Sequence, residues 1–347
     1  MAQTSPNVTI IQQADLTALN TLGVKAKAEK LIEISSIDQL HSLFDSGFFE
    51  SENPFILGGG SNVLLKKDIS RPVLKIDLDG VEIKFEDEKS VIIFAAAGVN
   101  WHSLVEWAVQ RDFGGIENLA LIPGTVGAAP IQNIGAYGVE LKDVLISTLY
   151  FDTITGEEKT LQNDECEFAY RDSIFKNRLK GKAIVTGIRL RLTKAPHSIN
   201  SSYRSLSEYL ENREISDPTI KDVFEAVIAI RKSKLPDPKL IGNAGSFFKN
   251  PVVTAKLYKT LVEKFGDIPG YKISEKEVKI PAGWLIEKAG WKGNRVGKVG
   301  TYENQALVLV NHGGATGEEL WSHALTIQKS VSKKFGIELA PEVNIVE

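Results

Sequence analysis

Two glycine-rich segments in the first half of the chain constrain its fold and its ligand more than any other feature. Residues 55–62 read FILGGGSN, and residues 123–138 read PGTVGAAPIQNIGAYG. Glycine has no Cβ atom, so the backbone N–H groups of such loops can surround an anion at close range. Neither segment has the spacing of a dinucleotide-binding G-x-G-x-x-G motif or of a P-loop. A pair of anion-binding loops predicts a ligand that contains a diphosphate.

The composition excludes several classes of protein. The chain has 347 residues with 41 basic and 44 acidic side chains, so it lacks the basic surplus typical of nucleic-acid-binding proteins. Cys166 is the single cysteine and the five histidines lack metal-ligand spacing, so neither an intrachain disulfide nor a metal site is predicted. The polar segment from Met1 to Asp15 has no signal-peptide pattern, and no apolar run approaches the ~20 residues of a membrane span. We therefore expect a cytoplasmic protein.

Hydrophobic periodicity predicts a mixed α+β chain with a strand-rich first half. Strands are predicted at 54–57, 73–76, 91–94, 149–151 and 184–192, with a hairpin turn at 152–156. Two helices are predicted to begin after Ser36 and after Asn100. A third is predicted to begin at Asp217-Pro218, with the proline in its first turn, and to end before Pro236. The last helices are predicted at 254–265 and from Thr316 to Gly336.

Five later blocks accompany the glycine-rich segments. They are residues 168–176 (FAYRDSIFK), 234–251 (KLPDPKLIGNAGSFFKNP), 270–293 (GYKISEKEVKIPAGWLIEKAGWKG), 305–311 (QALVLVN) and 341–347 (PEVNIVE). In this order and over nearly the whole chain, the segments resemble the UDP-N-acetylenolpyruvoylglucosamine reductase family of bacterial cell-wall enzymes. The 270–293 block is similar to the type of this family that has a tyrosine-bearing loop.

The resemblance implies a vanillyl-alcohol-oxidase-type FAD-binding fold of the α+β class, with two FAD-binding subdomains and a third domain over the substrate. We expect an FAD-binding domain over residues 1–235, divided into 1–78 and 79–235 and completed by 337–347. The substrate-binding domain is expected over residues 236–336. The resemblance also implies non-covalent FAD, NADPH as reductant, and conversion of UDP-N-acetylglucosamine enolpyruvate to UDP-N-acetylmuramate in peptidoglycan precursor synthesis.

The family positions that match this sequence imply roles for individual residues. Arg171 and Glu342 would hold and polarise the substrate carboxylate, and Ser246 would protonate the adjacent carbon. The implied cofactor-binding residues are Gly58, Gly59, Gly60, Ser61, Asn62, Pro123, Gly124, Thr125, Gly127, Ala128, Ile131, Gln132, Asn133, Gly135 and Ala136. The implied substrate-binding residues are Tyr203, Lys234, Asn250, Tyr271 and Gln305, with Tyr271 on a loop that covers the nucleotide.

The residues alone leave other roles open. Arg171 could form a surface ion pair, Ser246 could cap a helix or stabilise a buried turn, and Glu342 could face solvent from a terminal strand. Tyr271 could be a packing residue and Lys234 a solvated charge. His102, beside Trp101, is expected to be an ordinary helical residue rather than an attachment point for flavin.

Two other functions are compatible with these patterns. One is another FAD-dependent oxidase or dehydrogenase of the same fold, and the other is a flavoprotein that binds a nucleotide sugar without turnover. The presence of Ser246, the Tyr271 loop and Glu342 favours the reductase over both. A monomer is expected, with the enolpyruvyl nucleotide and NADPH as ligands and no nucleic-acid or membrane partner.

Overall fold

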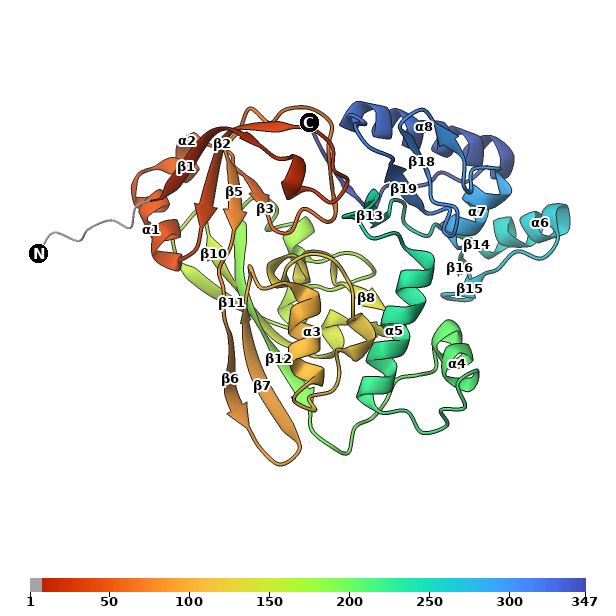
Figure 1. The fold of residues 1–347 in the computed structure, drawn as a ribbon, viewed down its shortest axis with the longest axis horizontal. Coiled ribbons are helices and arrows are strands. Elements are labelled where there is room, and N and C mark those ends of the chain that lie inside the picture. The colour runs from red at the N-terminus through yellow and green to blue at the C-terminus, as the bar shows by residue number, and fades with distance from the viewer. Residues whose placement is uncertain (1–7) are drawn as a thin grey trace, which may run out of the picture. The chain divides into compact units, whose positions relative to one another are not determined.

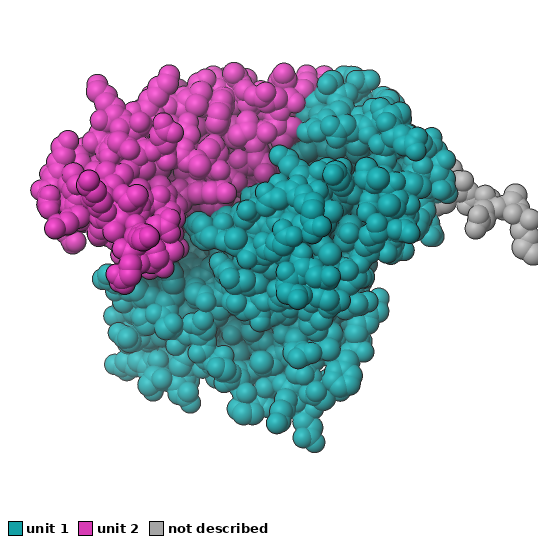
Figure 2. All heavy atoms as spheres, turned by 180° about the vertical axis from the view of Figure 1, so that it is seen from behind, with its two compact units in different colours: residues 1–14, 28–60, 69–231 teal, residues 15–27, 61–68, 232–347 magenta. Residues whose placement is uncertain are grey.

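We describe a computed structural model of residues 8–347, shown as a ribbon in Figure 1. The expectation for the polar N-terminal segment falls in part on residues 1–7, which lie outside the described residues. The chain divides into two compact units, which are coloured separately in Figure 2. Among the described residues, unit 1 holds 8–14, 28–60 and 69–231, and unit 2 holds 15–27, 61–68 and 232–347.

A five-stranded antiparallel sheet is the largest sheet of unit 1. Its strands follow the order β11 (Glu158–Gln162), β10 (Leu145–Asp152), β12 (Ala183–Thr193), β7 (Ser90–Ala96) and β6 (Val81–Glu86). The predicted hairpin closes at Gly156, whose N–H donates to the Asp152 carbonyl oxygen at 2.8 Å and whose φ of +72° favours glycine. The predicted strands at 91–94, 149–151 and 184–192 lie within β7, β10 and β12.

Two predicted helices cover one side of this sheet (Figure 1). α3 (Trp101–Val109) begins at Asn100, whose side chain accepts a hydrogen bond from the Ser103 N–H at 3.0 Å. α5 (Ile220–Lys234) packs into the same core, which includes Trp101, Leu104, Val105, Val223, Val227 and the β7 residues Val91 and Ile93. A shorter helix, α4 (Arg204–Glu211), was not predicted and adds Leu206 and Leu210 to this core. The shared apolar core fixes α3 and α5 against the sheet, and α5 ends at Lys234, a predicted substrate-binding residue.

The structure corrects the predicted start of α5. We expected the helix to begin at Asp217-Pro218, but it begins at Ile220. The N–H and the hydroxyl of Thr219 both donate to the Asp222 carboxylate, and the Asp222 N–H donates to Thr219 Oγ1. This reciprocal capping satisfies amides at the helix start, and proline has no N–H with which to take part in it.

A four-stranded sheet leads into the first glycine-rich segment. Its order is β1 (Thr9–Asp15), β2 (Lys27–Ile34), β5 (Val73–Ile76) and β3 (Phe55–Leu57), and β2 and β3 both run parallel to β5. α1 (Ile37–Asp45) begins with the predicted capping box of Ser36 and Gln39, and α2 (Phe48–Ser51) follows it. Because β3 ends at Leu57, the sheet sets the point at which the glycines begin. A hairpin of β8 (Gly135–Ala136) and β9 (Val139–Glu140) includes the end of the second segment.

Unit 2 is built of small sheets and helices. One sheet has the order β13 (Gly242–Ser246), β19 (Val308–Asn311), β18 (Val299–Thr301) and β17 (Arg295–Val296), and another has β14 (Val252–Thr254), β16 (Glu277–Lys279) and β15 (Tyr271–Lys272). β20 (Asn344–Val346) pairs in parallel with β4 (Val63–Leu65). α6 (Ala255–Phe265) and α8 (Gly317–Phe335) have the predicted caps, whereas α7 (Ala282–Lys288) was not predicted. No helix among residues 8–347 is both long and apolar enough to cross a bilayer.

Candidate functional site

The two glycine-rich segments lie against each other in unit 1. A Cβ atom added to Gly58 would lie 2.7 Å from Thr125 Oγ1, and one added to Gly59 would lie 2.9 Å from Gly124 Cα. Gly60 has a φ of +61°, which residues with a side chain rarely adopt. The loops can approach this closely only because these positions are glycine. Within unit 1, the structure therefore brings together predicted cofactor-binding residues of both segments, namely Gly58, Gly59, Gly124 and Thr125.

Several backbone amides at this contact have no acceptor in the described chain. The N–H groups of Gly59, Gly60, Gly124 and Thr125 donate to no oxygen of residues 8–347. The position of a Gly59 Cβ atom is 3.5 Å from the nitrogen of Thr125, so amides from both loops meet in one place. Groups of free amides like this one favour a phosphate or another anion. The residues present thus fit the diphosphate of a dinucleotide.

The second segment is anchored to the end of β7 and the start of α3. The N–H of Trp101 donates to the Gly124 carbonyl oxygen at 3.0 Å, and the N–H of Gly127 donates to the Ala97 carbonyl oxygen at 2.8 Å. A Cβ atom on Gly127 would lie 2.7 Å from the Cβ of Ala97. The N–H of Gly127 is therefore engaged within the protein, and its lack of a side chain lets the loop pack closely on Ala97.

Asn133, one of the predicted cofactor-binding residues, holds the loop through its side chain. Asn133 is buried and has a φ of +43°. Its amide nitrogen donates to Glu140 Oε2 at 3.0 Å and to the Ala169 carbonyl oxygen at 3.3 Å, and its Oδ1 accepts from the Lys142 N–H at 3.1 Å. These bonds occupy both ends of the carboxamide and fix the shape of the second segment.

Arg171 is held on the same loop. Its Nη2 donates to the Gly135 carbonyl oxygen at 2.8 Å, and its Nη1 donates to the Asn133 carbonyl oxygen at 3.5 Å. The φ of Arg171 is +55° and that of Tyr137 is +48°, in a region where bulky residues are strained and which recurs at functional sites. The structure therefore brings the predicted carboxylate-binding guanidinium to the second glycine-rich segment.

In unit 2, backbone pairing places Glu342 beside Ser246. Ser246 ends β13 and pairs with Val308 of β19. The N–H of Glu342 donates at 2.8 Å to the carbonyl oxygen of Phe247, the residue that follows Ser246. Phe248 and Pro341 continue this pairing. Two predicted catalytic residues that are far apart in the sequence are thus neighbours within this unit.

Asn62 joins this group through the terminal strand. Its Nδ2 donates to the Glu342 carbonyl oxygen at 3.4 Å, and its own carbonyl oxygen accepts from the Asn344 N–H at 3.0 Å. At the end of β4, Lys66 Nζ lies 2.6 Å from Glu347 Oε1. Their hydrogen bond raises the pKa of Lys66 and lowers the pKa of Glu347. Backbone pairing and this ion pair together hold the strand that follows Glu342.

The predicted substrate-binding residues are only partly brought together. Asn250 and Gln305 both lie against the start of α7. Asn250 Oδ1 accepts a hydrogen bond from the Ala282 N–H at 2.9 Å. Gln305 Oε1 lies 2.8 Å from the position that a Cβ atom would take on Gly283. Lys234 is exposed at the end of α5, and Tyr271 is exposed on β15. No hydrogen bond or ion pair within residues 8–347 joins either of them to Asn250 or Gln305.

Tyr203 lies in unit 1, at the residue before α4. Its ring packs edge-to-face on the ring of Tyr137, with centroids 5.4 Å apart. Nearly half of its surface remains exposed. The aromatic pair connects a predicted substrate-binding residue to the end of the second glycine-rich segment.

Sequence reasoning missed two polar residues around this loop. Asn118 is buried, and its Nδ2 donates to the carbonyl oxygens of Tyr137 at 3.0 Å and Asn200 at 2.8 Å. Arg231 of α5 lies close enough to Tyr137 and Arg171 to interact with both electrostatically. The signal for Asn118 is its place directly before the apolar run 119–122. The signal for Arg231 is its place four residues after Val227, on the apolar face of the predicted helix.

His102 lies in the first turn of α3, as expected. Its Nδ1 accepts a hydrogen bond from the Leu121 N–H at 3.1 Å, and its ring stacks on Phe224 with centroids 5.7 Å apart. The ring is therefore held by protein contacts on its Nδ1 side. Within residues 8–347, no group of three or more His, Cys, Asp or Glu side chains is arranged to hold a metal ion.

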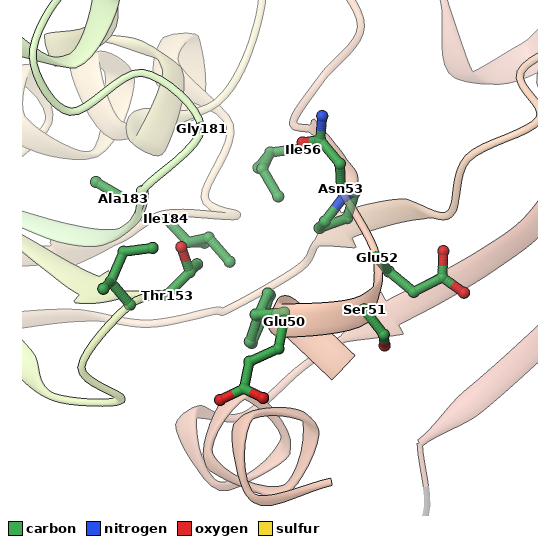
Figure 3. A pocket seen from close by; sticks show the side chains of 12 residues that line it. Glu50, Ser51, Glu52, Asn53, Ile56, Thr153, Gly181, Ala183 and Ile184 are labelled. Atoms are coloured by element: carbon green, nitrogen blue, oxygen red, sulfur yellow. The ribbon is translucent and has the colours of Figure 1, made fainter. Parts of the chain in front are cut away.

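A pocket of about 280 Å³ lies elsewhere in unit 1 (Figure 3). It is lined by α2 and the segment after it, by Thr153 and Ile154, and by the start of β12. The carboxylates of Glu50 and Glu52 lie at its edge, and Glu52 pairs with Lys30 at 3.6 Å. None of the predicted site residues lines it, so it is separate from the site described above.

The fold and the two loops define a class of protein, the FAD-binding flavoproteins. Residues 49–161, which include both glycine-rich segments, match the family model of an FAD binding domain. Residues 237–346 match the model described as the C-terminal domain of UDP-N-acetylenolpyruvoylglucosamine reductase. The chain belongs to the UDP-N-acetylenolpyruvoylglucosamine reductase family, as its relatives show.

Relatives match the chain over nearly its whole length. The UDP-N-acetylenolpyruvoylglucosamine reductase of Flavobacterium johnsoniae is 50% identical over 327 residues, which cover 94% of this chain and 96% of that protein. The protein of the same name from Chromobacterium violaceum is 45% identical over 329 residues, with coverage of 94% and 96%. These matches confirm the predicted family and, with the domain match, FAD as its cofactor.

A solved structure supports the fold directly. The crystal structure of UDP-N-acetylenolpyruvylglucosamine reductase from Thermus caldophilus matches with a TM-score of 0.66 at 24% identity, covering 98% of this chain and 99% of that one. At this identity the likeness shows the fold alone. It confirms the predicted α+β fold of the FAD-binding type.

Proposed function

We propose that this chain reduces UDP-N-acetylglucosamine enolpyruvate to UDP-N-acetylmuramate with NADPH and bound FAD, in the formation of peptidoglycan precursors. The observation that carries the proposal is 50% identity to a reductase of that name over 94% of the chain. When bound, FAD supplies the hydride that NADPH provides. The free amides of Gly59, Gly60, Gly124 and Thr125 would hold its diphosphate without a covalent bond to the protein.

Arg171 would stabilise the charge that forms in the substrate. The reaction adds a hydride to the methylene carbon and a proton to the adjacent carbon of the enolpyruvyl group, so negative charge collects near the carboxylate before the proton arrives. A planar guanidinium can bind both carboxylate oxygens at once. Because the Gly135 and Asn133 carbonyl oxygens already hold Arg171, little reorganisation is needed as the charge develops.

Ser246 and Glu342 would complete the proton transfer. Ser246 would donate its hydroxyl proton to the carbon beside the carboxylate, and Glu342 would polarise that carboxylate. The hydrogen bond from the Glu342 N–H to the Phe247 carbonyl oxygen supports this pairing of roles, because it keeps the two residues in register. Serine is a weak acid near neutral pH, so water or a neighbouring group must return its proton.

The remaining predicted residues would bind the nucleotide. Tyr203, Lys234, Asn250 and Gln305 would contact its diphosphate and uracil, and Tyr271 would fold over it. We assign residues 236–336 to substrate binding, and residues 1–235 with 337–347 to FAD binding. The contact between Asn62 and the Glu342 carbonyl oxygen supports grouping the terminal segment with a glycine-rich segment.

We also propose that the protein acts as a monomer in the cytoplasm. The single cysteine, Cys166, is buried and free, which suits a reducing compartment. Light scattering during size-exclusion chromatography should give the mass of one chain, and twice that mass would contradict the proposal.

Ser246→Ala tests the proposed chemistry by separating two half-reactions. Reduction of the flavin by NADPH should persist, because it requires no proton from serine. Reoxidation by the enolpyruvyl nucleotide should slow by about 10²–10⁴-fold, the usual effect of losing a general acid. Stopped-flow absorbance measures both rates, with Ser322→Ala, exposed on α8, as the control. Equal slowing of both half-reactions would mean that Ser246 is structural.

A further inference from the structure

Arg171 occupies a strained position in a tight turn. Residues 169–172 form this turn, in which the N–H of Ala169 donates to the Asp172 carbonyl oxygen at 3.1 Å and the N–H of Asp172 donates to the Ala169 carbonyl oxygen at 3.3 Å. Arg171 is the third of the four residues and has a φ of +55°. A turn residue with such a φ is ordinarily glycine, because a Cβ atom destabilises this conformation. Contacts outside the turn must therefore help to hold Arg171 in it.

Lys176 supplies one of these contacts. Its Nζ donates to the carbonyl oxygen of Arg171 at 3.2 Å, and its side chain is half-buried. A hydrogen bond from a charged donor is stronger than one between neutral groups. Lys176 ends a short 3₁₀ turn, Ile174–Lys176, which places its ammonium group within reach of a residue five positions earlier. The bond fixes the backbone of the strained residue itself.

Ser173 supplies the second contact. Its side chain is fully buried, and its Oγ donates to the Ile131 carbonyl oxygen at 2.7 Å and accepts from the Phe175 N–H at 3.2 Å. A hydroxyl that donates one hydrogen bond and accepts another is held in one orientation. Ile131 belongs to the second glycine-rich segment. Ser173 therefore fastens the residue two positions after Arg171 to that segment.

The turn is joined to the second glycine-rich segment at three points. The Ala169 carbonyl oxygen accepts from Asn133 Nδ2 at 3.3 Å, Arg171 Nη2 donates to the Gly135 carbonyl oxygen at 2.8 Å, and Ser173 holds the far side of the turn. Loss of one of these points would let the turn shift or relax against the segment. The position of the Arg171 guanidinium thus depends on residues that are not themselves proposed to contact a ligand.

We propose that Lys176 and Ser173 are positioning residues that keep the Arg171 guanidinium in place for the substrate carboxylate. The inference rests on the proposed function of Arg171 and adds two residues to which the family resemblance assigned no role. Without either bond, Arg171 can relax from its positive φ to a more favourable backbone conformation. Only molecules that keep the strained conformation then bind the carboxylate well, so the measured affinity falls by the fraction that keep it.

The test compares two nucleotides that differ at the carboxylate. UDP-N-acetylmuramate carries it, and UDP-N-acetylglucosamine has the same diphosphate without it. Dissociation constants for both are measured by isothermal titration calorimetry with protein saturated with FAD. Lys176→Met and Ser173→Ala should each weaken binding of UDP-N-acetylmuramate by about 5- to 30-fold, which is the strain of one left-handed residue expressed as an equilibrium constant. Binding of UDP-N-acetylglucosamine should stay unchanged.

Each variant has a matched control. Lys180→Met removes an exposed lysine four residues after Lys176. Ser147→Ala removes a buried hydroxyl of β10 that has no hydrogen-bond partner among residues 8–347. Neither control should change the affinity for either nucleotide. Because Lys176 is only half-buried, Lys176→Met keeps the proposal testable even if Ser173→Ala folds poorly.

A double-mutant cycle separates positioning from a general effect on stability. In the Arg171→Met background, Lys176→Met and Ser173→Ala should cause no further loss of affinity for UDP-N-acetylmuramate, because both act through Arg171. In the wild-type background, both should slow reoxidation of the flavin by the enolpyruvyl nucleotide while reduction by NADPH stays unchanged. Stopped-flow absorbance measures these two rates.

Three results would overturn the inference. An equal loss of affinity for both nucleotides would mean that the variants loosen the whole site. Losses that add to that of Arg171→Met would give the two residues an effect independent of Arg171. Unchanged affinity in both single variants would leave them no positioning role. Failure of the proposed function is visible separately, because Arg171→Met alone would then bind UDP-N-acetylmuramate as tightly as the wild type does.

Discussion

Replacing Gly59 with alanine should weaken FAD binding while unit 1 stays folded. The φ of Gly59 lies outside the left-handed region, so alanine adds no backbone strain. The new Cβ would lie 2.9 Å from Gly124 Cα and 3.3 Å from Gly124 C, whereas ordinary contacts begin at 3.4 Å. Both obstacles are backbone atoms, so the loops must separate by about 0.5 Å to restore an ordinary contact.

The size of the effect follows from that displacement. Hydrogen bonds from N–H to oxygen span 2.7–3.2 Å, so a shift of about 0.5 Å lengthens an amide–phosphate bond beyond the favourable range. A hydrogen bond to a charged group contributes about 1.5–3 kcal/mol. Loss of one such bond should raise the dissociation constant of FAD by about 10- to 100-fold.

The assay is titration of the apoprotein with FAD, followed by quenching of flavin fluorescence. Gly114→Ala is a matched control, because its Cβ would lie 2.7 Å from His197 Nδ1 and 2.9 Å from Thr193 Oγ1, away from both loops. We expect Gly114→Ala to lower the melting temperature without changing the FAD dissociation constant. If Gly59→Ala binds FAD as tightly as the wild type does, the loops do not hold the diphosphate and the reasoning is refuted.

Three further predictions concern unit 2. Glu342→Gln should lower turnover by about 10²–10³-fold at unchanged FAD content and melting temperature, and wild-type turnover would leave Glu342 a solvent-facing residue. Tyr271→Ala should raise the KM for the enolpyruvyl nucleotide more than it slows flavin reduction by NADPH, and an unchanged KM would contradict a covering role. Lys66→Met should lower the melting temperature near neutral pH. The folded-state pKa of Glu347 is depressed, so the difference in melting temperature between the wild type and Lys66→Met should shrink as the pH falls and Glu347 becomes protonated. A difference in melting temperature that does not change with pH would refute this ion-pair account.

Local signals predicted the elements of the fold well. The Ser36 and Thr316 capping boxes and the glycines at 266 and 336 mark helix ends that the structure contains, because these features depend only on neighbouring residues. Pro218 was misleading because proline is common in first helical turns, whereas the Thr219 and Asp222 pair decides the start here. α4 and α7 span only 8 and 7 residues, which is too short for a helical period to stand out in the sequence.

The candidate site depends on contacts that no local pattern contains. The sequence indicates that Gly59 and Gly124 belong to anion-binding loops, but only the folded chain shows that their backbones touch. The Asn133 carboxamide is a clear example, since its partners lie in two other segments, Glu140 and Lys142 in one and Ala169 in the other. The bond from Glu342 to Phe247 likewise joins segments that are close only after folding.

The central claim is tested most directly by the visible spectrum of the purified protein under anaerobic conditions. The account predicts oxidised flavin bands that bleach when NADPH is added and return when UDP-N-acetylglucosamine enolpyruvate follows, with UDP-N-acetylmuramate formed in equal amount to the flavin reoxidised. A protein that binds no flavin, or one whose bands stay bleached after the enolpyruvyl nucleotide is added, would contradict it.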